Sequence, residues 1–301
     1  MRASAAPEGP QGMAMDQWKA YSILCKAPIA CFSACSAVTG YLLATGPQLR
    51  PMVLLVLGVL LLAAGASALN QYQERDIDAR MDRTRLRPLP AGAMAPRTAL
   101  NASALLVASG LILLGMVGAV VTALGAFTVL WYNGLYTPLK RRTAFAAVPG
   151  ALVGVLPPVM GWLAGGGSVN DPKVLALAVL FFLWQVPHFW LLLIAHRNAY
   201  ERAGLPHLSR ILPGDRLKRL TFLWTASASV ACFGLPLFGL GASPVIAVLL
   251  PFSALVMVAQ SLRLFQRDDG PATALASFRS NTVFLATIMV LLSLDALIRR
   301  G

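Results

Sequence analysis

Nine apolar runs limit the folds open to this chain more than any other feature of its sequence. Each is about twenty residues long, which is enough for a helix to cross the hydrocarbon core of a bilayer. Only helices and closed barrels can satisfy their backbone hydrogen bonds there, so the runs predict an all-α, multi-pass membrane protein. They fall at about residues 21–45, 50–70, 98–116, 118–137, 144–165, 173–196, 218–240, 243–262 and 280–298.

The lysines and arginines support this arrangement, because nearly all of them fall in alternate loops. Of the 25, only Arg50, Lys173, Arg299 and Arg300 lie on the side opposite the N-terminus. By the positive-inside rule, the N-terminus and the even-numbered loops are then cytoplasmic. This topology and anionic lipid account for the net charge of +13, so no nucleic-acid partner is required.

Composition excludes an ordinary soluble domain, since 57% of the residues are hydrophobic and the mean hydropathy is +0.68. Residues 1–15 are rich in Ala, Pro and Gly, and we expect them to form a disordered cytoplasmic tail. Residues 16–301 are expected to form a single transmembrane domain. Its helices would surround a central cavity, which the loops after the second and sixth runs would cap on the cytoplasmic side.

The segment 70–88, directly after the second run, is dense in charge. If the helix continues through it, Asn70, Glu74 and Asp78 share one face, each about 6 Å further along the axis, whereas Asp76 points elsewhere. An amide and two carboxylates in this arrangement suit Mg²⁺, which takes its remaining ligands from water and a phosphate-bearing substrate. The arginines that follow could neutralise the rest of a diphosphate, and they are Arg80, Arg83, Arg85 and Arg87.

A second polar cluster ends the fourth run on the same side of the membrane. Tyr136 and Thr137 precede three consecutive cations, Lys140, Arg141 and Arg142. These side chains suit the binding of an anion at the membrane surface, although such a cluster is also an ordinary topology anchor.

The third cluster closes the sixth run and holds all three histidines, His188, His196 and His207. Pro187 would kink the helix just before His188 and free backbone groups inside the bundle. An imidazole at that depth must be paired or must face a cavity, so it indicates a functional site. The alternative is a hydrogen bond between helices. The loop that follows adds Tyr200 and further cations.

Together these segments resemble the UbiA superfamily of intramembrane aromatic prenyltransferases, and most of all its heme O synthase branch. The similarity runs from Lys26-x-Pro28 to the last span, and the Pro-His-Phe and Arg-Thr-x-x-Arg-Pro elements are the most specific to the branch. The matching segments are Asn70-x-x-x-Glu74-x-x-x-Asp78, Arg83-Thr84-x-x-Arg87-Pro88-Leu89, Tyr136-Thr137 with Lys140 to Thr143, Pro157-Pro158 with Gly161-Trp162, Pro187-His188-Phe189, and Tyr200 with Ala203 to Pro206.

The chain departs from the branch pattern at several positions. Glu74 stands where the first acidic motif usually has Asp, and the Tyr-Thr to Lys-Arg-Arg segment is one residue short. In the second motif, Ala199 replaces the usual acid and His196 replaces an Arg, while Glu201 is out of register. The second metal site and the acceptor are therefore left open.

The resemblance implies transfer of a farnesyl group from farnesyl diphosphate to a vinyl group of heme b, with release of diphosphate, to make heme O. It implies Mg²⁺ on Asn70, Glu74 and Asp78, with Lys140 and Arg141 assisting catalysis. Heme b would be a substrate rather than a cofactor. The enzyme would lie in the bacterial inner membrane, with heme A synthase or a terminal oxidase as a partner. The residues expected to bind the two substrates are Arg83, Arg87, Tyr136, Arg142, His188 and Tyr200.

Three alternatives remain from the sequence. The first is a prenyltransferase with another acceptor, such as a quinone precursor or a chlorophyll-type tetrapyrrole. The second is a transporter, although the charges lie at span ends on one side rather than near mid-membrane. The third is a non-catalytic heme-handling protein, which would not need Asn70, Glu74 and Asp78 in one stack.

Overall fold

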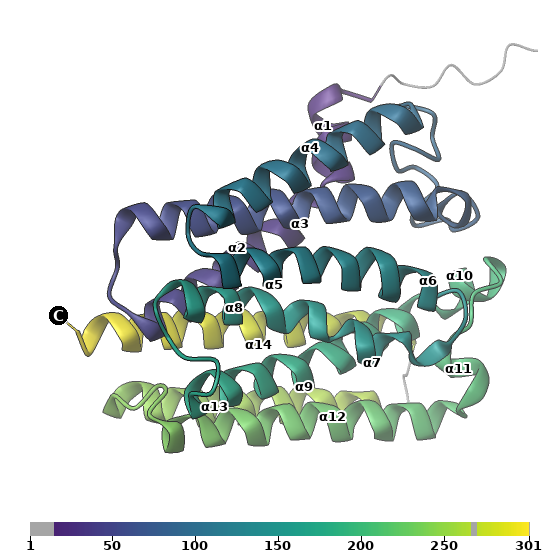
Figure 1. The fold of residues 1–301 in the computed structure, drawn as a ribbon. Coiled ribbons are helices and arrows are strands. Elements are labelled where there is room, and N and C mark those ends of the chain that lie inside the picture. Colours follow the sequence, from purple (N-terminus) through teal and green to yellow (C-terminus); the bar gives the residue numbers. More distant parts are fainter. Residues whose placement is uncertain (1–14, 266–269, 301) are drawn as a thin grey trace, which may run out of the picture.

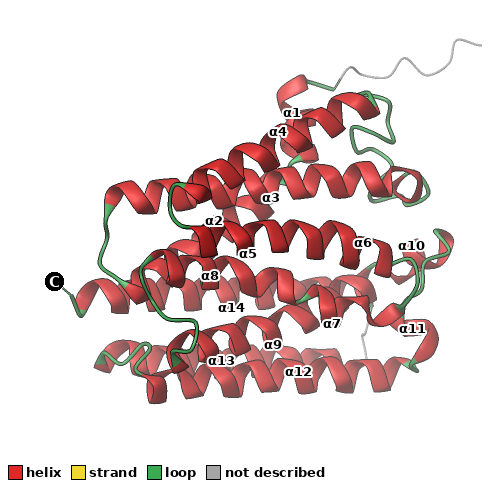
Figure 2. Ribbon diagram, viewed as in Figure 1, coloured by secondary structure: helices red, strands yellow, loops and turns green. Residues whose placement is uncertain are grey.

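The structure, a computed structural model, describes residues 15–265 and 270–300. The predicted disordered tail therefore lies outside the described residues except for Met15. Every regular element in the described part is helical (Figure 2). Nine stretches within it are long and apolar enough to cross a membrane, which confirms the number predicted from the sequence.

The nine spans are built from single helices or from short helices in series. Besides them, three short helices lie at loops: α1 (Gln17–Leu24), α10 (Arg197–Arg202) and α11 (Leu208–Ile211). The spans are α2 (Ala27–Ala44), α3 (Leu49–Asp78), α4 (Pro96–Gly115), α5 with η1 and α6 (Ala119–Val129, Leu130–Tyr136, Thr137–Leu139), η2 with α7 and α8 (Ala144–Ala146, Ala147–Gly150, Leu152–Ala164), α9 (Pro172–Ala195), α12 with η3 (Gly214–Gly234, Leu235–Phe238), α13 with η4 (Pro244–Ser261, Leu262–Phe265) and α14 (Pro271–Ile298).

The starts of several spans follow from local chemistry. Proline is the first residue of α4, α9, α13 and α14, where its missing N–H costs nothing and its fixed φ suits a helix. Asp171 also caps α9, because its Oδ1 accepts a hydrogen bond from the Lys173 N–H at 2.9 Å. Pro187, inside α9, is accommodated without ending the helix.

Three spans differ most from their predicted limits. The first run is divided between α1 and α2, because the chain turns at Cys25 and Lys26. Helix α3 continues past residue 70 to Asp78, and α14 begins at Pro271 rather than near residue 280. The extension of α3 matters most, since it makes residues 70–78 of the charged segment helical.

The helices pack as one bundle with two large apolar clusters. One cluster joins α9, α12, α13 and α14, and the other joins α2, α3, α5 and α8. Helices α2 and α8 approach closely at two glycines: a Cβ on Gly40 would lie 1.9 Å from the Pro158 carbonyl oxygen, and one on Gly161 would lie 1.9 Å from that of Ala37. Figure 1 shows helices α6, α10 and α11 and the loop that follows α3 at one end of the bundle, with the C-terminus at the other end. The three polar clusters of the sequence thus share one end.

Candidate active site

The last turns of α3 present Asn70, Glu74 and Asp78 in one stack. Because α3 is unbroken to Asp78, these residues lie on one face as their spacing predicts. Asn70 and Asp78 are buried, and the side chain of Glu74 is 12% exposed. Asp76 points away, since its side chain is 69% exposed. The protein therefore keeps one amide and two carboxylates away from bulk water at the bundle's end.

Each member of this stack is contacted by one basic side chain from another segment. A buried carboxylate without a partner would be costly, so the cations beside Glu74 and Asp78 offset the burial of their neighbours. The three basic residues come from the turn between α1 and α2, the loop after α6 and the loop after α3. The contacts are Lys26 Nζ to Asn70 Oδ1 at 2.8 Å, Lys140 Nζ to Glu74 Oε1 at 2.5 Å, and Arg87 Nη1 to Asp78 Oδ2 at 2.7 Å.

Lys26 reaches the stack because the first span is broken beside it. Its backbone is left-handed, with φ 46°, between α1 and α2. The buried Gln71 side chain holds the end of α1 by donating to the carbonyl oxygens of Ile23 at 2.6 Å and Leu24 at 2.9 Å. Lys26 Nζ also lies 3.3 Å from the Tyr132 hydroxyl. Lys26 was not among the predicted site residues, and the only signal for its position was the Lys26-x-Pro28 pattern with which the resemblance begins.

A π-helix in the fourth span supplies the facing wall. Seven residues, Leu130–Tyr136, adopt this conformation, which is rare and often occurs at functional sites. Within it, Asn133 Nδ2 donates to the Ala66 carbonyl at 3.0 Å and to Gln73 Oε1 at 3.2 Å. Thr137 Oγ1, just beyond, accepts from Asn70 Nδ2 at 3.0 Å. Asn133 and Gln73 were not among the predicted site residues, whereas Thr137 was predicted only as part of an anion-binding cluster.

The three predicted cations after Thr137 differ in their positions. Lys140 contacts the stack through Glu74. Burial alone would lower the pKa of Lys140, but the Glu74 carboxylate and the nearby tyrosines outweigh it and raise the pKa. Lys140 therefore remains protonated. Arg141 is exposed and donates to the Gln73 carbonyl at the end of α3. Arg142 is also exposed, and among the described residues it makes none of the contacts that build the stack.

An aromatic row leads from the stack into the bundle. Lys140 Nζ lies 5.1 Å from the centroid of the Tyr136 ring, which makes Tyr136 the first ring beyond the charges. Tyr136 is stacked between Tyr132 and Phe189, with centroids 5.7 Å and 5.8 Å away. Phe189 lies 6.3 Å from His188. The predicted residues Tyr136 and His188 are therefore joined by one continuous row.

His188 is held between two more rings. Its centroid is 4.6 Å from that of Trp184 and 4.3 Å from that of Phe278 on α14. Its Nδ1 is buried and has no hydrogen-bond partner among the described residues, so the helix-to-helix hydrogen bond expected as an alternative is not seen for that atom. An unpaired imidazole nitrogen amid aromatic rings is suited to contact with a planar or metal-bearing ligand.

The second motif of the sequence forms an apolar contact instead of an acidic site. Ala199 packs with Met81 and Ala203, and Tyr200 lies against this cluster. Glu201 does not supply the missing acid, since its side chain is 57% exposed and lies 3.8 Å from His207. Helix α10 thus packs against the loop after α3 through apolar side chains.

A cavity of about 400 Å³ opens beside this contact. We call it the cationic cavity, because its lining contains three arginines and one acid; the lining residues are Asp82, Arg83, Ala195, His196, Arg197, Asn198, Ala199, Arg202 and Pro271. Arg202 bridges the two loops through an ion pair to Asp82 at 2.5 Å. Arg83 and Arg87 were both predicted to bind substrate, but Arg83 lines the cationic cavity whereas Arg87 contacts Asp78 of the stack.

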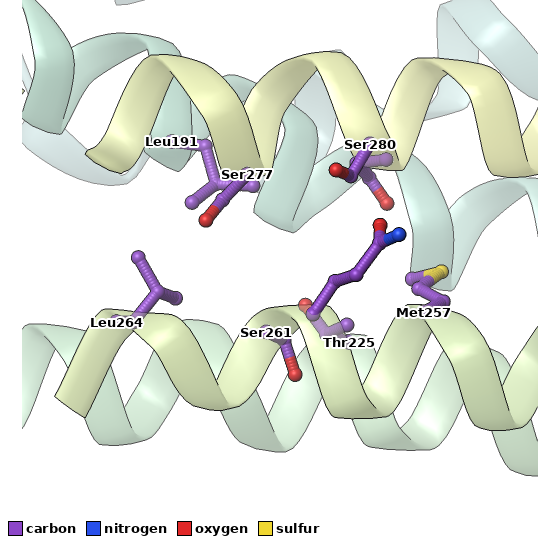
Figure 3. A pocket seen from close by; sticks show the side chains of 9 residues that line it. Leu191, Thr225, Met257, Ser261, Leu264, Ser277 and Ser280 are labelled. Atoms are coloured by element: carbon purple, nitrogen blue, oxygen red, sulfur yellow. The ribbon is translucent and has the colours of Figure 1, made fainter. Parts of the chain in front are cut away.

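A second, much smaller cavity lies between α9, α12, α13 and α14 (Figure 3). It measures about 10 Å³, which is room for roughly one water molecule. Ser277 and Ser280 of α14 point into it, and the buried Ser277 Oγ and Asn281 Oδ1 have no partner among the described residues. A water molecule there would satisfy these groups.

The stack fits Mg²⁺ by its donor chemistry. No group of three or more His, Cys, Asp and Glu side chains in the described residues could hold a metal by itself. Mg²⁺ seldom uses such a cage, because it binds through one or two carboxylates, waters and substrate phosphates. Glu74, Asp78 and the Asn70 amide oxygen match that requirement.

Comparison with known proteins agrees with the fold and shows the family. Residues 33–288 match the model of the UbiA prenyltransferase family. The chain is 41% identical over 287 residues to a protoheme IX farnesyltransferase of Oleidesulfovibrio alaskensis, an alignment that covers 94% of this chain and 98% of that protein.

Solved structures share the fold at low identity. A UbiA homolog from Aeropyrum pernix K1 superposes with a TM-score of 0.70 at 20% identity, covering 87% of this chain and 98% of that one. A UbiA homolog from Archaeoglobus fulgidus bound to GPP and Mg²⁺ superposes with a TM-score of 0.64 at 16% identity, covering 91% and 99%.

Proposed function

The chain belongs to the UbiA prenyltransferase family, and from this membership we propose that it transfers the farnesyl group of farnesyl diphosphate to a vinyl group of heme b, making heme O. The acceptor and the prenyl group are proposed from the name of the Oleidesulfovibrio alaskensis relative. The structural observation that carries the donor half is the convergence of three basic side chains on the stack formed by Asn70, Glu74 and Asp78.

The stack would hold Mg²⁺, which supplies positive charge to the diphosphate oxygens when bound. The Archaeoglobus fulgidus homolog, solved with GPP and Mg²⁺, supports this assignment. Diphosphate oxygens would attract Lys26, Lys140 and Arg87, which the protein keeps beside the stack. Their charges then stabilise the negative charge that grows on the leaving group as the allylic C–O bond breaks.

The aromatic row would guide the reacting carbon. Tyr136 and Phe189 present ring faces next to the cationic end of the site, where an allylic cation forms and is shielded from water. The farnesyl carbon bonds to the terminal vinyl carbon of heme b, and water then adds to the adjacent carbon with loss of a proton. His188, with its unpaired Nδ1, would contact the heme.

The chain is an integral membrane protein, and we propose that it lies in the bacterial inner membrane with the stack at the cytoplasmic end. This orientation gives farnesyl diphosphate access from the cytoplasm while its tail remains in apolar surroundings.

The experiment that tests this function is an assay of the purified protein in detergent with heme b, farnesyl diphosphate and Mg²⁺, followed by mass spectrometry of the product. We expect a farnesylated, hydrated heme from the wild type and none from Asp78→Asn. The matched control is Asp76→Asn, which makes the same change one half-turn away at an exposed position. If diphosphate is released only with another acceptor, the proposed acceptor is wrong. If heme binds and no acceptor consumes farnesyl diphosphate, the chain is a heme-handling protein.

A further inference from the structure

We propose that the cationic cavity binds the two propionate carboxylates of the acceptor, so that heme b is anchored at the membrane surface with its vinyl groups directed into the bundle. This inference rests on the proposed function, since it assigns a second subsite to the same acceptor. It concerns Arg83, Arg197 and Arg202, which the donor half of the reaction does not use.

The charge of the cavity matches such a ligand. Three arginines and the single acid Asp82 leave a surplus of two positive charges. Heme b carries two carboxylates on one edge of its ring. Guanidinium groups bind carboxylates through paired N–H donors, and Arg83 and Arg197 are exposed and have no acid partner among the described residues. His196 adds a donor without adding charge, because burial and the nearby Arg83 lower its pKa.

Ala199 is the second reason for this assignment, because it forms part of the cavity wall. It stands where the motif that the chain resembles carries an acid. A carboxylate at this position would cancel one of the surplus charges and repel a propionate. With Ala199 packed against Met81, the wall is apolar there and the arginines remain available.

The cavity is separate from the diphosphate contacts. Lys26, Lys140 and Arg87 contact the stack on α3, whereas the cavity lies between the loop after α3 and the end of α9. The protein thus presents two groups of cations at one end of the bundle. One group contacts the amide and carboxylate oxygens of the stack, whereas in the other group only Arg202 has an acid partner within the described part of the chain, Asp82.

The position of the cavity relative to His188 fits the length of a heme. His188 and His196 are both in or at the end of α9, eight residues apart, which corresponds to about 12 Å along the helix axis. A heme spans a comparable distance from a vinyl group on one edge of its ring to the propionates on the opposite edge. One heme could therefore place a vinyl group beside the aromatic rings at His188 while its carboxylates remain in the cavity.

The test compares binding of zinc protoporphyrin IX with binding of its dimethyl ester, which lacks the two charges. Absorbance titrations are performed in detergent on the wild type, on Arg83→Gln/Arg197→Gln and on Arg216→Gln. Arg216 is an exposed arginine at the same end of the bundle that does not line the cavity, so it controls for general charge. Affinities are compared between proteins for each porphyrin, so that different partition of the two porphyrins into micelles cancels.

We expect the double variant to bind the diacid about tenfold more weakly than the wild type, which is about 1.4 kcal/mol, and to bind the ester with unchanged affinity. Arg216→Gln should change neither. An equal loss for both porphyrins, or no loss for either, overturns the carboxylate subsite.

A parallel calorimetric titration with inorganic pyrophosphate and Mg²⁺ separates the two groups of cations. Loss of pyrophosphate binding in the double variant, with porphyrin binding retained, would assign the arginines to the donor and overturn the proposal. If the wild type binds neither porphyrin, the heme acceptor itself is wrong. If the double variant loses affinity equally for the diacid and the ester, heme remains the proposed acceptor and only the carboxylate subsite is rejected.

Discussion

The ammonium group of Lys26 donates to the Asn70 amide oxygen at 2.8 Å, although 44 residues separate them along the chain. The contact brings the break in the first span to the stack on α3, and it depends on the left-handed backbone of Lys26. The amide of Asn70 in turn donates to Thr137 Oγ1 at 3.0 Å. The turn before α2, helix α3 and helix α6 are therefore connected through one side chain, and the turn that opens the first span is part of the active site.

Lys26→Met should lower kcat/KM for farnesyl diphosphate by about 100-fold, the usual effect of removing one donor to a developing negative charge. Steady-state assays with wild type measure the change. Lys19→Met removes the same charge from an exposed position on α1 and should leave kcat/KM within about twofold. If the two variants behave alike, Lys26 acts only as a general surface charge.

Gln71→Leu should loosen the tether between α1 and α3. The two carbonyl oxygens of Ile23 and Leu24 would lose their donor, which costs about 1 to 3 kcal/mol. We expect a lower melting temperature in detergent, faster proteolytic cleavage near Lys26 and a reduced kcat/KM, because Lys26 is no longer held beside Asn70. Gln48→Leu, at the opposite end of α3, is the control. Unchanged cleavage near Lys26 would contradict this role for Gln71.

Glu74 and Lys140 should be strongly coupled in stability. The side chains are only 12% and 27% exposed, so removing one leaves the other shielded and unpaired. Glu74→Gln and Lys140→Met should each lower the melting temperature, while the double variant should lose less than the sum of the two. All three should be inactive. Additive losses would show that the pair contributes no coupling.

Much of the fold was predictable because the bilayer imposes it. Apolar runs must become helices there, so the nine spans followed from the sequence even where proline or glycine interrupts them. The stack was predictable for a similar reason, since helical periodicity alone places Asn70, Glu74 and Asp78 on one face.

The remaining parts of the site depend on packing between distant segments. Nothing local to Lys26 predicts a left-handed backbone, and no sequence pattern distinguishes the π-helix around Asn133 from an α-helix. Arg83 and Arg87 look equivalent in the sequence, yet they face different places because the loop after α3 turns between them. Arg142 was predicted to bind substrate because it follows Lys140 and Arg141 in the sequence. In the structure it is exposed and does not contact the stack.

Removing Mg²⁺ should weaken binding of an unreactive thiolo analogue of farnesyl diphosphate by at least about tenfold. The stack oxygens are already contacted by cations, so Mg²⁺ alone should bind weakly, and the diphosphate must supply the other ligands and attract the three basic side chains. Calorimetry with Mg²⁺ and with EDTA measures this difference. Asp78→Asn should abolish the Mg²⁺ dependence, and Asp76→Asn should retain it. Tight binding of Mg²⁺ without the analogue would show that the cations do not oppose the metal.

His188→Leu should weaken the binding of heme b without lowering the stability of the protein. The buried Nδ1 has no partner among the described residues, so an apolar replacement of similar size removes an unsatisfied group and should not lower the melting temperature. If His188 contacts heme, the affinity for heme b falls by at least about tenfold and its Soret band shifts, while affinity for the farnesyl diphosphate analogue is unchanged. His207→Leu is the matched control, since its Nδ1 is likewise buried without a partner but lies outside the aromatic row. Equal heme affinity in both variants would mean that His188 serves the packing of α9 against α14 and that the heme is held by other residues.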